Sequence, residues 1–305
     1  MTRPVLARRN VLTYAVSAML AAGGLGVLCA RQRPAEPAAL RRRANALGAR
    51  HGLRIDYGAP TAFFVPPYGP EDAVIPGGTA TPVDPSALPP ALDGIEEALA
   101  VYPAGFVSTV CKGIFVCGSL TLDGAEAGGT FGPAWLILVA TLKVRESGIY
   151  ETCRLGVHHE LSSLIWAKLP DVQVRWSALM PADWTPAKTN AEVLIGRQEQ
   201  EDRSDGFLSA YGSTTSENDF NVYAETMFAF PSRLLAAASR APVVARKAAL
   251  IFEAYERLDP RFREMFMRRG LDGLRSNTAS SEDLGLRVSP VGTPRGEIVR
   301  PGDGH

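Results

Sequence analysis

Two spacings of hydrophobic residues alternate along the first half of this chain. Apolar positions three and four residues apart predict helices at 38–51 and 92–102. Short runs rich in β-branched and aromatic residues predict strands at 53–57, 114–122 and 135–142. The first half should therefore combine a small sheet with helices.

Only the helical spacing continues in the second half of the chain. It predicts helices at 150–169, 216–230, 243–258 and 261–269. The first of these should end before Pro170, where a polar stretch, 170–215, begins. Ser216, with Asp219 three residues later, is typical of a helix N-cap with its capping-box acid. A sheet-containing part followed by helices predicts an α+β fold.

Glycine and proline mark two irregular segments. The stretch 59–90 is rich in both residues and is predicted to be a loop. The Gly-rich stretch 123–132 is predicted to connect two neighbouring strands, because it lacks the Gly-Lys-Ser/Thr ending of a phosphate-binding loop.

Composition restricts the class of protein. The 305 residues are 46% hydrophobic and 21% charged, with a formal net charge of zero, as in ordinary globular proteins. Nucleic acid is excluded as an obligate partner, because binding phosphates needs clustered Lys and Arg. The one dense basic run, at 41–43, is interpreted as a solvated helix face. We predict one main domain at 31–275.

Both ends of the chain should lie outside that domain. Residues 1–30 combine a basic start with an uncharged apolar run from position 11, which is typical of an export signal or an uncleaved membrane anchor. Arg8 and Arg9 resemble a twin-arginine signal. The predicted location is the periplasm or the exterior of the cell, with membrane anchoring if the signal is retained. The polar segment 276–305 is predicted to be disordered.

The cysteines leave two alternatives. Cys111 and Cys117 are close enough in sequence to form a disulfide across a turn, which export would favour. The bridge would be excluded if the intervening residues form one extended strand. Otherwise these two and Cys153 are buried, reduced thiols. No Cys-x-x-Cys motif is present, so a thiolate zinc site is not expected.

The main candidate for chemistry is the run His158-His159-Glu160-Leu161-Ser162-Ser163. His159 and Glu160 match the first half of the His-Glu-x-x-His pattern, in which a helix offers two histidines to zinc and a glutamate to a bound water. Ser163 stands where the second histidine belongs. On a helix, His159 and Ser163 fall opposite the aliphatic residues and should face a second layer or a cleft. The alternative is a merely polar outer face.

A second polar helix carries Glu217, Asn218, Asp219, Asn221 and Glu225. Together with the His159-Glu160 helix, it resembles the core of a gluzincin-type zinc metallopeptidase, of the kind seen in exported zinc-binding proteins. The resemblance covers 150–230. It implies a zincin-like fold, a zinc ion and hydrolysis of peptide or protein substrates.

Carried over by position, the resemblance makes His159 a zinc ligand and Glu160 the general base that activates the metal-bound water. Glu225 would be the carboxylate ligand, with Asp219 as the alternative. Tyr211 would donate a hydrogen bond to the oxyanion. His158 is the nearest substitute for the missing histidine, although it lies about 100° around the helix from His159.

Two positions depart from the family pattern. Ser163 offers a neutral hydroxyl, and Asn221, four residues before Glu225, offers an amide where a ligating acid is expected. Two functions therefore stay open. One is an exported zinc metallopeptidase, and the other is an inactive zincin-like binding or structural protein of the cell envelope.

Overall fold

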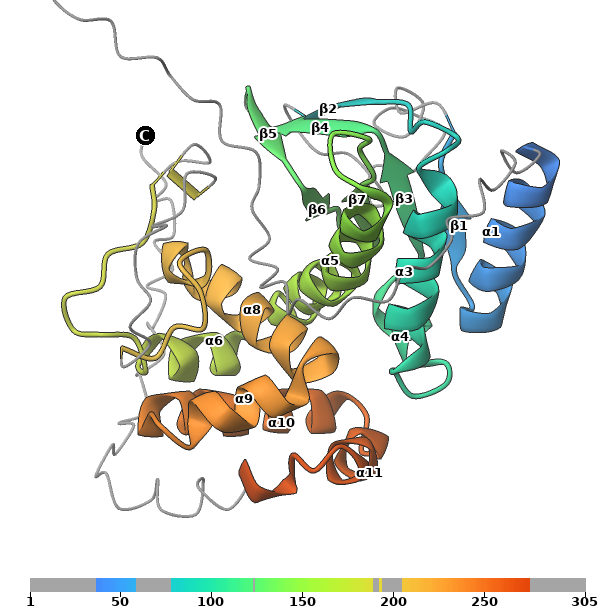
Figure 1. Ribbon diagram of the computed structural model, residues 1–305. Coiled ribbons are helices and arrows are strands. Elements are labelled where there is room, and N and C mark those ends of the chain that lie inside the picture. The colour runs from blue at the N-terminus through green and yellow to red at the C-terminus, as the bar shows by residue number, and fades with distance from the viewer. Residues whose placement is uncertain (1–36, 59–77, 123, 189–191, 194–204, 275–305) are drawn as a thin grey trace, which may run out of the picture.

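The computed structural model describes residues 37–58, 78–122, 124–188, 192–193 and 205–274. These residues form an α+β fold, as predicted, in which the sheets and the first helices precede an all-helical part (Figure 1).

Both predicted terminal segments, 1–30 and 276–305, lie outside the described residues. None of the described helices is long and apolar enough to cross a membrane.

The strands are Arg54–Asp56 (β1), Gly78–Thr81 (β2), Gly113–Cys117 (β3), Ser119–Leu122 (β4), Ala125–Ala127 (β5), Gly129–Phe131 (β6) and Trp135–Val139 (β7). One sheet has four strands in the order β1-β3-β7-β6, and a smaller one has the order β2-β4-β5. In the larger sheet β1, β3 and β7 are parallel, whereas β6 is an antiparallel edge strand.

The two central strands of the larger sheet are buried on both faces. Alternate residues point to opposite sides of a strand. One face belongs to the main core and contributes Ile114, Val116, Leu136 and Leu138. The other face forms a second apolar cluster with Leu120 of β4 and contributes Phe115, Cys117, Ile137 and Val139. Continuous apolar runs are what such doubly covered strands require.

The helices are Pro37–His51 (α1), Leu88–Ala100 (α3), Phe106–Val110 (α4), Glu146–Trp166 (α5), Pro170–Ser177 (α6), Ser216–Ala229 (α8), Pro231–Ala238 (α9), Pro242–Leu258 (α10) and Arg261–Arg268 (α11). Helix α5 occupies the middle of the fold, where it contacts α3, β6 and β7 on one side and α8 on the other. Gly94 permits the close approach of α3, because a Cβ there would lie 2.2 Å from the Tyr150 carbonyl oxygen.

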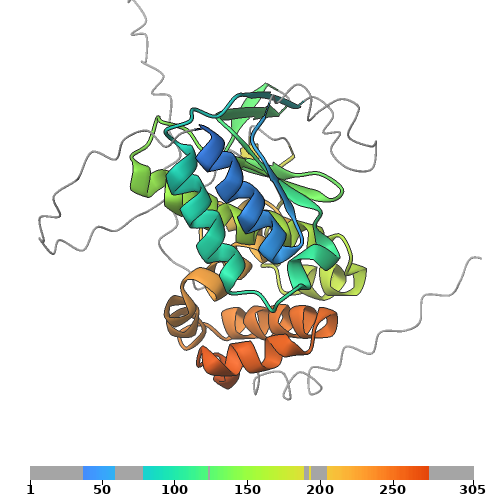
Figure 2. The ribbon, with the colours of Figure 1, turned by 90° about the vertical axis from the view of Figure 1, so that its right-hand side faces the viewer.

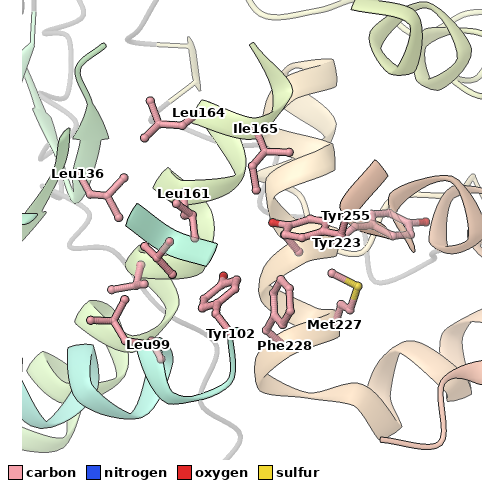
Figure 3. Close-up of a cluster of buried hydrophobic side chains, with 14 of the residues drawn as sticks. Leu99, Tyr102, Leu136, Leu161, Leu164, Ile165, Tyr223, Met227, Phe228 and Tyr255 are labelled. Atoms are coloured by element: carbon pink, nitrogen blue, oxygen red, sulfur yellow. The ribbon is translucent and has the colours of Figure 1, made fainter. Parts of the chain in front are cut away.

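The C-terminal helices pack beneath the sheet-containing part, as the side view shows (Figure 2). Aromatic side chains join the two parts. Tyr102, which follows α3, packs 4.7 Å from Phe228 of α8 between ring centroids, and Leu161 of α5 lies in the same buried core (Figure 3). The core therefore holds α5 and α8 in a fixed relation.

The sequence-based strand boundaries were wrong around the glycine-rich segment. The predicted strand 114–122 is two strands, β3 and β4, which separate at Gly118 and enter different sheets. A Cβ at Gly118 would lie 2.4 Å from the Pro82 carbonyl oxygen, so this close crossing needs glycine. The predicted connection 123–132 contains β5 and β6, because short strands with few apolar residues escape a periodicity argument.

The predicted helix boundaries also differ from the structure next to two prolines and at the N-terminus of α8. Pro170 begins α6 as well as following α5, and Pro231 begins α9, which the sequence did not predict. Thr215, rather than Ser216, is the N-cap of α8, and its hydroxyl accepts a hydrogen bond from the Asn218 amide. Asp219 is not a capping acid, since its carboxylate forms an ion pair with Lys247.

The predicted Cys111–Cys117 disulfide is wrong. Both thiols and that of Cys153 are free and buried. Strand β3 makes the chain between Cys111 and Cys117 extended, and an extended chain holds the two residues too far apart for a disulfide. Burial raises the pKa of each thiol to about 12, so all three should be unreactive.

Candidate functional site

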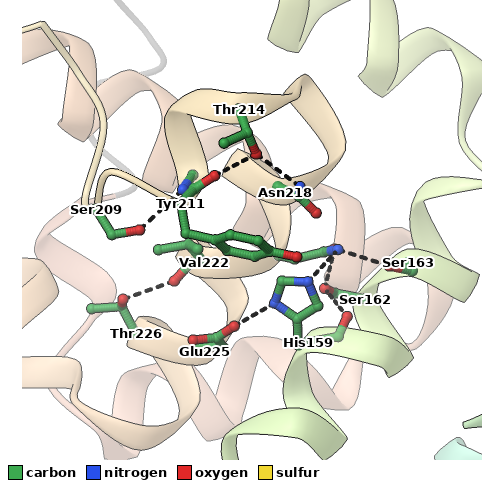
Figure 4. Close-up of polar contacts among 12 residues, drawn as sticks. His159, Ser162, Ser163, Ser209, Tyr211, Thr214, Asn218, Val222, Glu225 and Thr226 are labelled. Carbon is green, nitrogen blue, oxygen red and sulfur yellow. Dashed lines mark hydrogen bonds and ion pairs between the residues drawn. The ribbon is translucent and has the colours of Figure 1, made fainter. Parts of the chain in front are cut away.

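The candidate site lies between α5 and α8, two helices that pack directly against each other. Every residue of α5 from position 157 to 166 is buried, including His159, Ser162 and Ser163. The polar face of α5 is therefore covered by a second layer, as predicted, and that layer is α8 (Figure 4).

Helix α8 presents its polar residues at a spacing of four, which places them on one side. From its first turn onward these are Glu217, Asn221 and Glu225. The start of the helix is fixed by the Thr215 cap and by a second bond, in which Asn218 donates to the Thr214 hydroxyl at 2.9 Å. The cap thus fixes where α8 begins and therefore which of its residues face α5.

His159 and Glu225 form the central contact. The Nδ1 atom of His159 is hydrogen-bonded to Glu225 Oε1, and both side chains are largely buried. The predicted approach of these two residues from different helices is confirmed. Burial opposes the imidazolium charge, but the bond to Glu225 and the charges of Glu160 and Glu217 raise the pKa of His159 to about 9.

Asn221 lies on the opposite edge of the imidazole. Its Nδ2 is 2.7 Å from Ser163 Oγ, to which it donates, and 3.3 Å from His159 Nε2. Its Oδ1 accepts a hydrogen bond from Ser162. The amide therefore lies between His159 Nε2 and the position that the second histidine of a complete motif would occupy. A side chain fills the place where a metal would join these two groups.

This network also suits a protonated imidazole. An imidazolium Nε2–H must donate, and the Asn221 amide rotated by 180° offers Oδ1 to it and to the Ser163 hydroxyl. The amide nitrogen then donates to Ser162, whose single proton goes to the His159 carbonyl oxygen 2.8 Å away. In this arrangement the imidazolium has an acceptor, which agrees with the raised pKa of His159, but the single Ser163 proton then cannot also go to Glu217.

Glu160 and Glu217 border the same network. Glu160 is buried next to β6, where a Cβ on Gly129 would lie 2.8 Å from its Oε1. Burial raises the pKa of Glu160 to about 7, although the charge of His159 opposes this shift. Burial also raises the pKa of Glu217, although a hydrogen bond with Ser163 acts to lower it. The site thus combines one imidazole with three carboxyl groups.

Tyr211 reaches the site from the 3₁₀ turn η1 (Gly212–Thr214), which it precedes. Its ring centroid is 5.5 Å from that of His159. The Thr214 hydroxyl donates to the Tyr211 carbonyl oxygen at 2.6 Å within this turn, and it accepts from Asn218 of α8 at 2.9 Å, which ties the turn to α8 (Figure 4). The structure thus brings together His159, Glu160, Tyr211 and Glu225 from the predicted site.

His158 is not brought to this site. Its Nδ1 is 2.8 Å from the Tyr102 hydroxyl, and its ring stacks on Phe228 at 5.2 Å between centroids. Burial and the charges of Arg154 and Arg269 lower its pKa to about 3. The regular helix turns it away from His159, so it cannot replace the missing ligand.

Asp219, the alternative carboxylate ligand, also lies elsewhere. It bonds to Lys247 at 2.6 Å and to the Trp176 indole at 2.9 Å. All three side chains are fully buried. Asp219 therefore anchors α8 to α10 and α6 and takes no part in the site.

The side chains present do not fit a catalytic zinc ion. Such a site needs three strong donors, usually imidazole, thiolate or carboxylate. A neutral hydroxyl and an amide occupy the two other positions of the pattern. The three carboxyl groups of the site do not converge with the imidazole on one point, since Glu225 lies at Nδ1 and Asn221 at Nε2. Among the described residues, no three His, Cys, Asp or Glu side chains are grouped to hold a metal.

Comparison with protein-family models, with curated proteins and with solved structures gives no significant match. The assignment of a function therefore rests on the residues themselves.

Sequence reasoning had not assigned Ser162 and Glu217 to the site. The spacing of four from Glu217 to Asn221 and on to Glu225 was a usable signal, because it places all three on one side of α8. Ser162 had no such signal, since its role depends on how Asn221 packs across the interface.

Proposed function

We propose that this chain is a zincin-like protein that has lost its metal centre and acts by binding a peptide or protein, without zinc-dependent hydrolysis. The observation that carries this proposal is the Asn221 amide, which bonds to Ser163 and lies 3.3 Å from His159 Nε2. Hydrogen bonds hold the helices together where the family pattern would use a metal.

The arrangement of elements supports the zincin-like assignment. Strands β3 and β7 precede α5 in the chain, α5 carries His159 and Glu160, and α8 then supplies Glu225. These are the order and the facing geometry that the resemblance implies. Glu225 contacts Nδ1 of His159 and would orient the ring, so it suits the role of a supporting acid better than that of a ligand.

A zinc metallopeptidase is the competing proposal. It is favoured by Glu160, whose pKa of about 7 suits a general base at neutral pH. It needs a second strong ligand besides His159, and neither Ser163 nor Asn221 provides one. A serine hydrolase is not favoured, because the Asn221 amide, and no serine hydroxyl, is hydrogen-bonded to His159 Nε2.

Rebuilding the metal site tests the proposal. The double variant Ser163→His and Asn221→Glu would restore two histidines at i, i+4 and a carboxylate ligand on α8. We expect purified wild type to carry no stoichiometric zinc and the double variant to bind it, as measured by elemental mass spectrometry.

Peptidase assays give the second readout. Wild type and Glu160→Gln should both leave unstructured protein substrates uncleaved. Hydrolysis by zinc-loaded wild type that Glu160→Gln abolishes would refute the proposal and support the metallopeptidase.

A further inference from the structure

A polar pocket lies at a different face of α5 from the one that carries His159. It has a volume of about 130 Å³ and is bordered by α3, α5 and the end of α8. The polar side chains that line it are Glu97, Arg154, His158 and Arg269. Nothing in the proposed function uses this pocket.

Arg269 is the main charged group of the pocket. It directly follows α11, and the one hydrogen bond that its side chain makes to a described residue runs from Nη1 to the Phe228 carbonyl oxygen at 2.5 Å. No carboxylate among the described residues forms an ion pair with it. Burial lowers its pKa, but a guanidinium keeps its charge at neutral pH. A half-buried cation without a counter-ion favours an anionic ligand.

His158 supplies a second donor. Its Nδ1 is 2.8 Å from the Tyr102 hydroxyl. That phenol is buried and has no other hydrogen-bond partner in the described structure, so its proton must point to Nδ1. The neutral imidazole then carries its own proton on Nε2, and the described residues offer no acceptor for it. An N–H donor without a partner among the described residues thus belongs to a ring that lines the pocket.

Arg154 limits the total charge of the pocket. Its guanidinium bonds to Glu151 through two atoms and to Glu97 at 3.3 Å, so its charge is compensated. Glu97 and Glu151 together carry one charge more than Arg154, so with Arg269 the charges around the pocket sum to zero. An anionic group would therefore be held by Arg269 itself, which has no ion-pair partner among the described residues, and not by a net positive charge. A volume of about 130 Å³ has room for one such group with water.

We propose that this pocket binds one small oxyanion, a carboxylate or a phosphate group, through the Arg269 guanidinium and the His158 Nε2–H. Both are donors, and the charged oxygens of an oxyanion are acceptors. The pocket lies against Phe228 of α8, so a bound anion would also stabilise the packing of α8 on α3 and α5.

The test is a titration of the full chain with inorganic phosphate and, separately, with acetate, at constant ionic strength set by sodium chloride. Isothermal calorimetry should show saturable binding of at least one oxyanion. Arg269→Gln should weaken that binding by about tenfold or more, because a charge-assisted bond is lost. Arg268→Gln is the matched control. Arg268 is the preceding residue, is exposed and pairs with Glu264, so binding should not change.

Two outcomes would overturn the proposal. One is the absence of saturable binding by either anion beyond the effect of chloride, and the other is equal binding by Arg269→Gln and wild type. Should Arg269→Gln fail to fold, ¹⁵N NMR of the wild-type His158 ring decides the matter. Its Nε2–H signal should shift on titration with the bound anion, and an unchanged signal would refute the site.

Discussion

Replacing Glu225 with glutamine should destabilise the protein much more at pH 6 than at pH 10. The variant keeps an oxygen that can accept from His159 Nδ1 but removes the negative charge. In wild type, burial opposes the charge of His159, yet Glu225 and its acidic neighbours raise the pKa from 6.5 to about 9. The protonated imidazole is therefore favoured by folding.

The size of the effect follows from this shift. At 1.36 kcal/mol per unit, a rise from 6.5 to about 9 corresponds to about 3 kcal/mol. Because the folded-state pKa is raised, this stabilisation is fully present below 6.5 and is lost as the pH rises through 9. Glu225→Gln should cost up to about 3 kcal/mol at pH 6. At pH 10 it should cost less than about 1 kcal/mol, because the neutral imidazole can still donate to the glutamine oxygen.

Urea denaturation of wild type and variant at the two pH values measures this difference directly. Glu264→Gln is the control, because Glu264 pairs with Arg268 on the surface. Its cost should stay below about 1 kcal/mol at both pH values. An equal cost of Glu225→Gln at pH 6 and pH 10, or a larger one at pH 10, would show that the charge of Glu225 does not stabilise His159.

Three further substitutions test other parts of the structure by the same method. Asp219→Asn leaves Lys247 buried without its carboxylate and should cost roughly 3–5 kcal/mol; a loss below about 1 kcal/mol, as for a surface pair, would contradict this. Gly94→Ala places a Cβ 2.2 Å from a backbone oxygen of α5 and should cost about 1–3 kcal/mol, whereas Gly128→Ala, with open space around its Cβ, should not. Glu160→Gln should gain up to about 3 kcal/mol relative to wild type between pH 5 and pH 9, because wild type loses stability as the pH rises from 4.5 through the raised pKa of about 7. A pH-independent effect of Glu160→Gln would refute the last expectation.

Much of the fold was predictable because its central elements have strong apolar patterns. Strands β3 and β7 are short continuous apolar runs, and helices α1, α3 and α10 show helical spacing. Strands β5 and β6 were missed because their stability comes from pairing with β4 and β7, which no local pattern records. Pro231 follows the predicted helix 216–230 and begins α9, because proline is suited to the first turn of a helix.

The site was predictable at the level of helices, and less so at the level of atoms. The motif around His159 and the acid at Glu225 were sufficient to predict that α5 and α8 face each other, which the structure confirms. The role of Asn221 was not predictable, because its three partners are on α5 and depend on how the helices pack. Sequence spacing fixes which side of a helix a residue occupies, but not the group that it meets.

Zinc titration of the full wild-type chain tests the central claim most directly. A chromophoric chelator of known affinity would report competition for the metal, with His159→Ala as the matched variant. If Asn221 has replaced the metal, wild type should show no site with a dissociation constant below about 1 μM, and His159→Ala should behave alike. One tightly bound zinc ion per chain that is lost in His159→Ala would contradict the account.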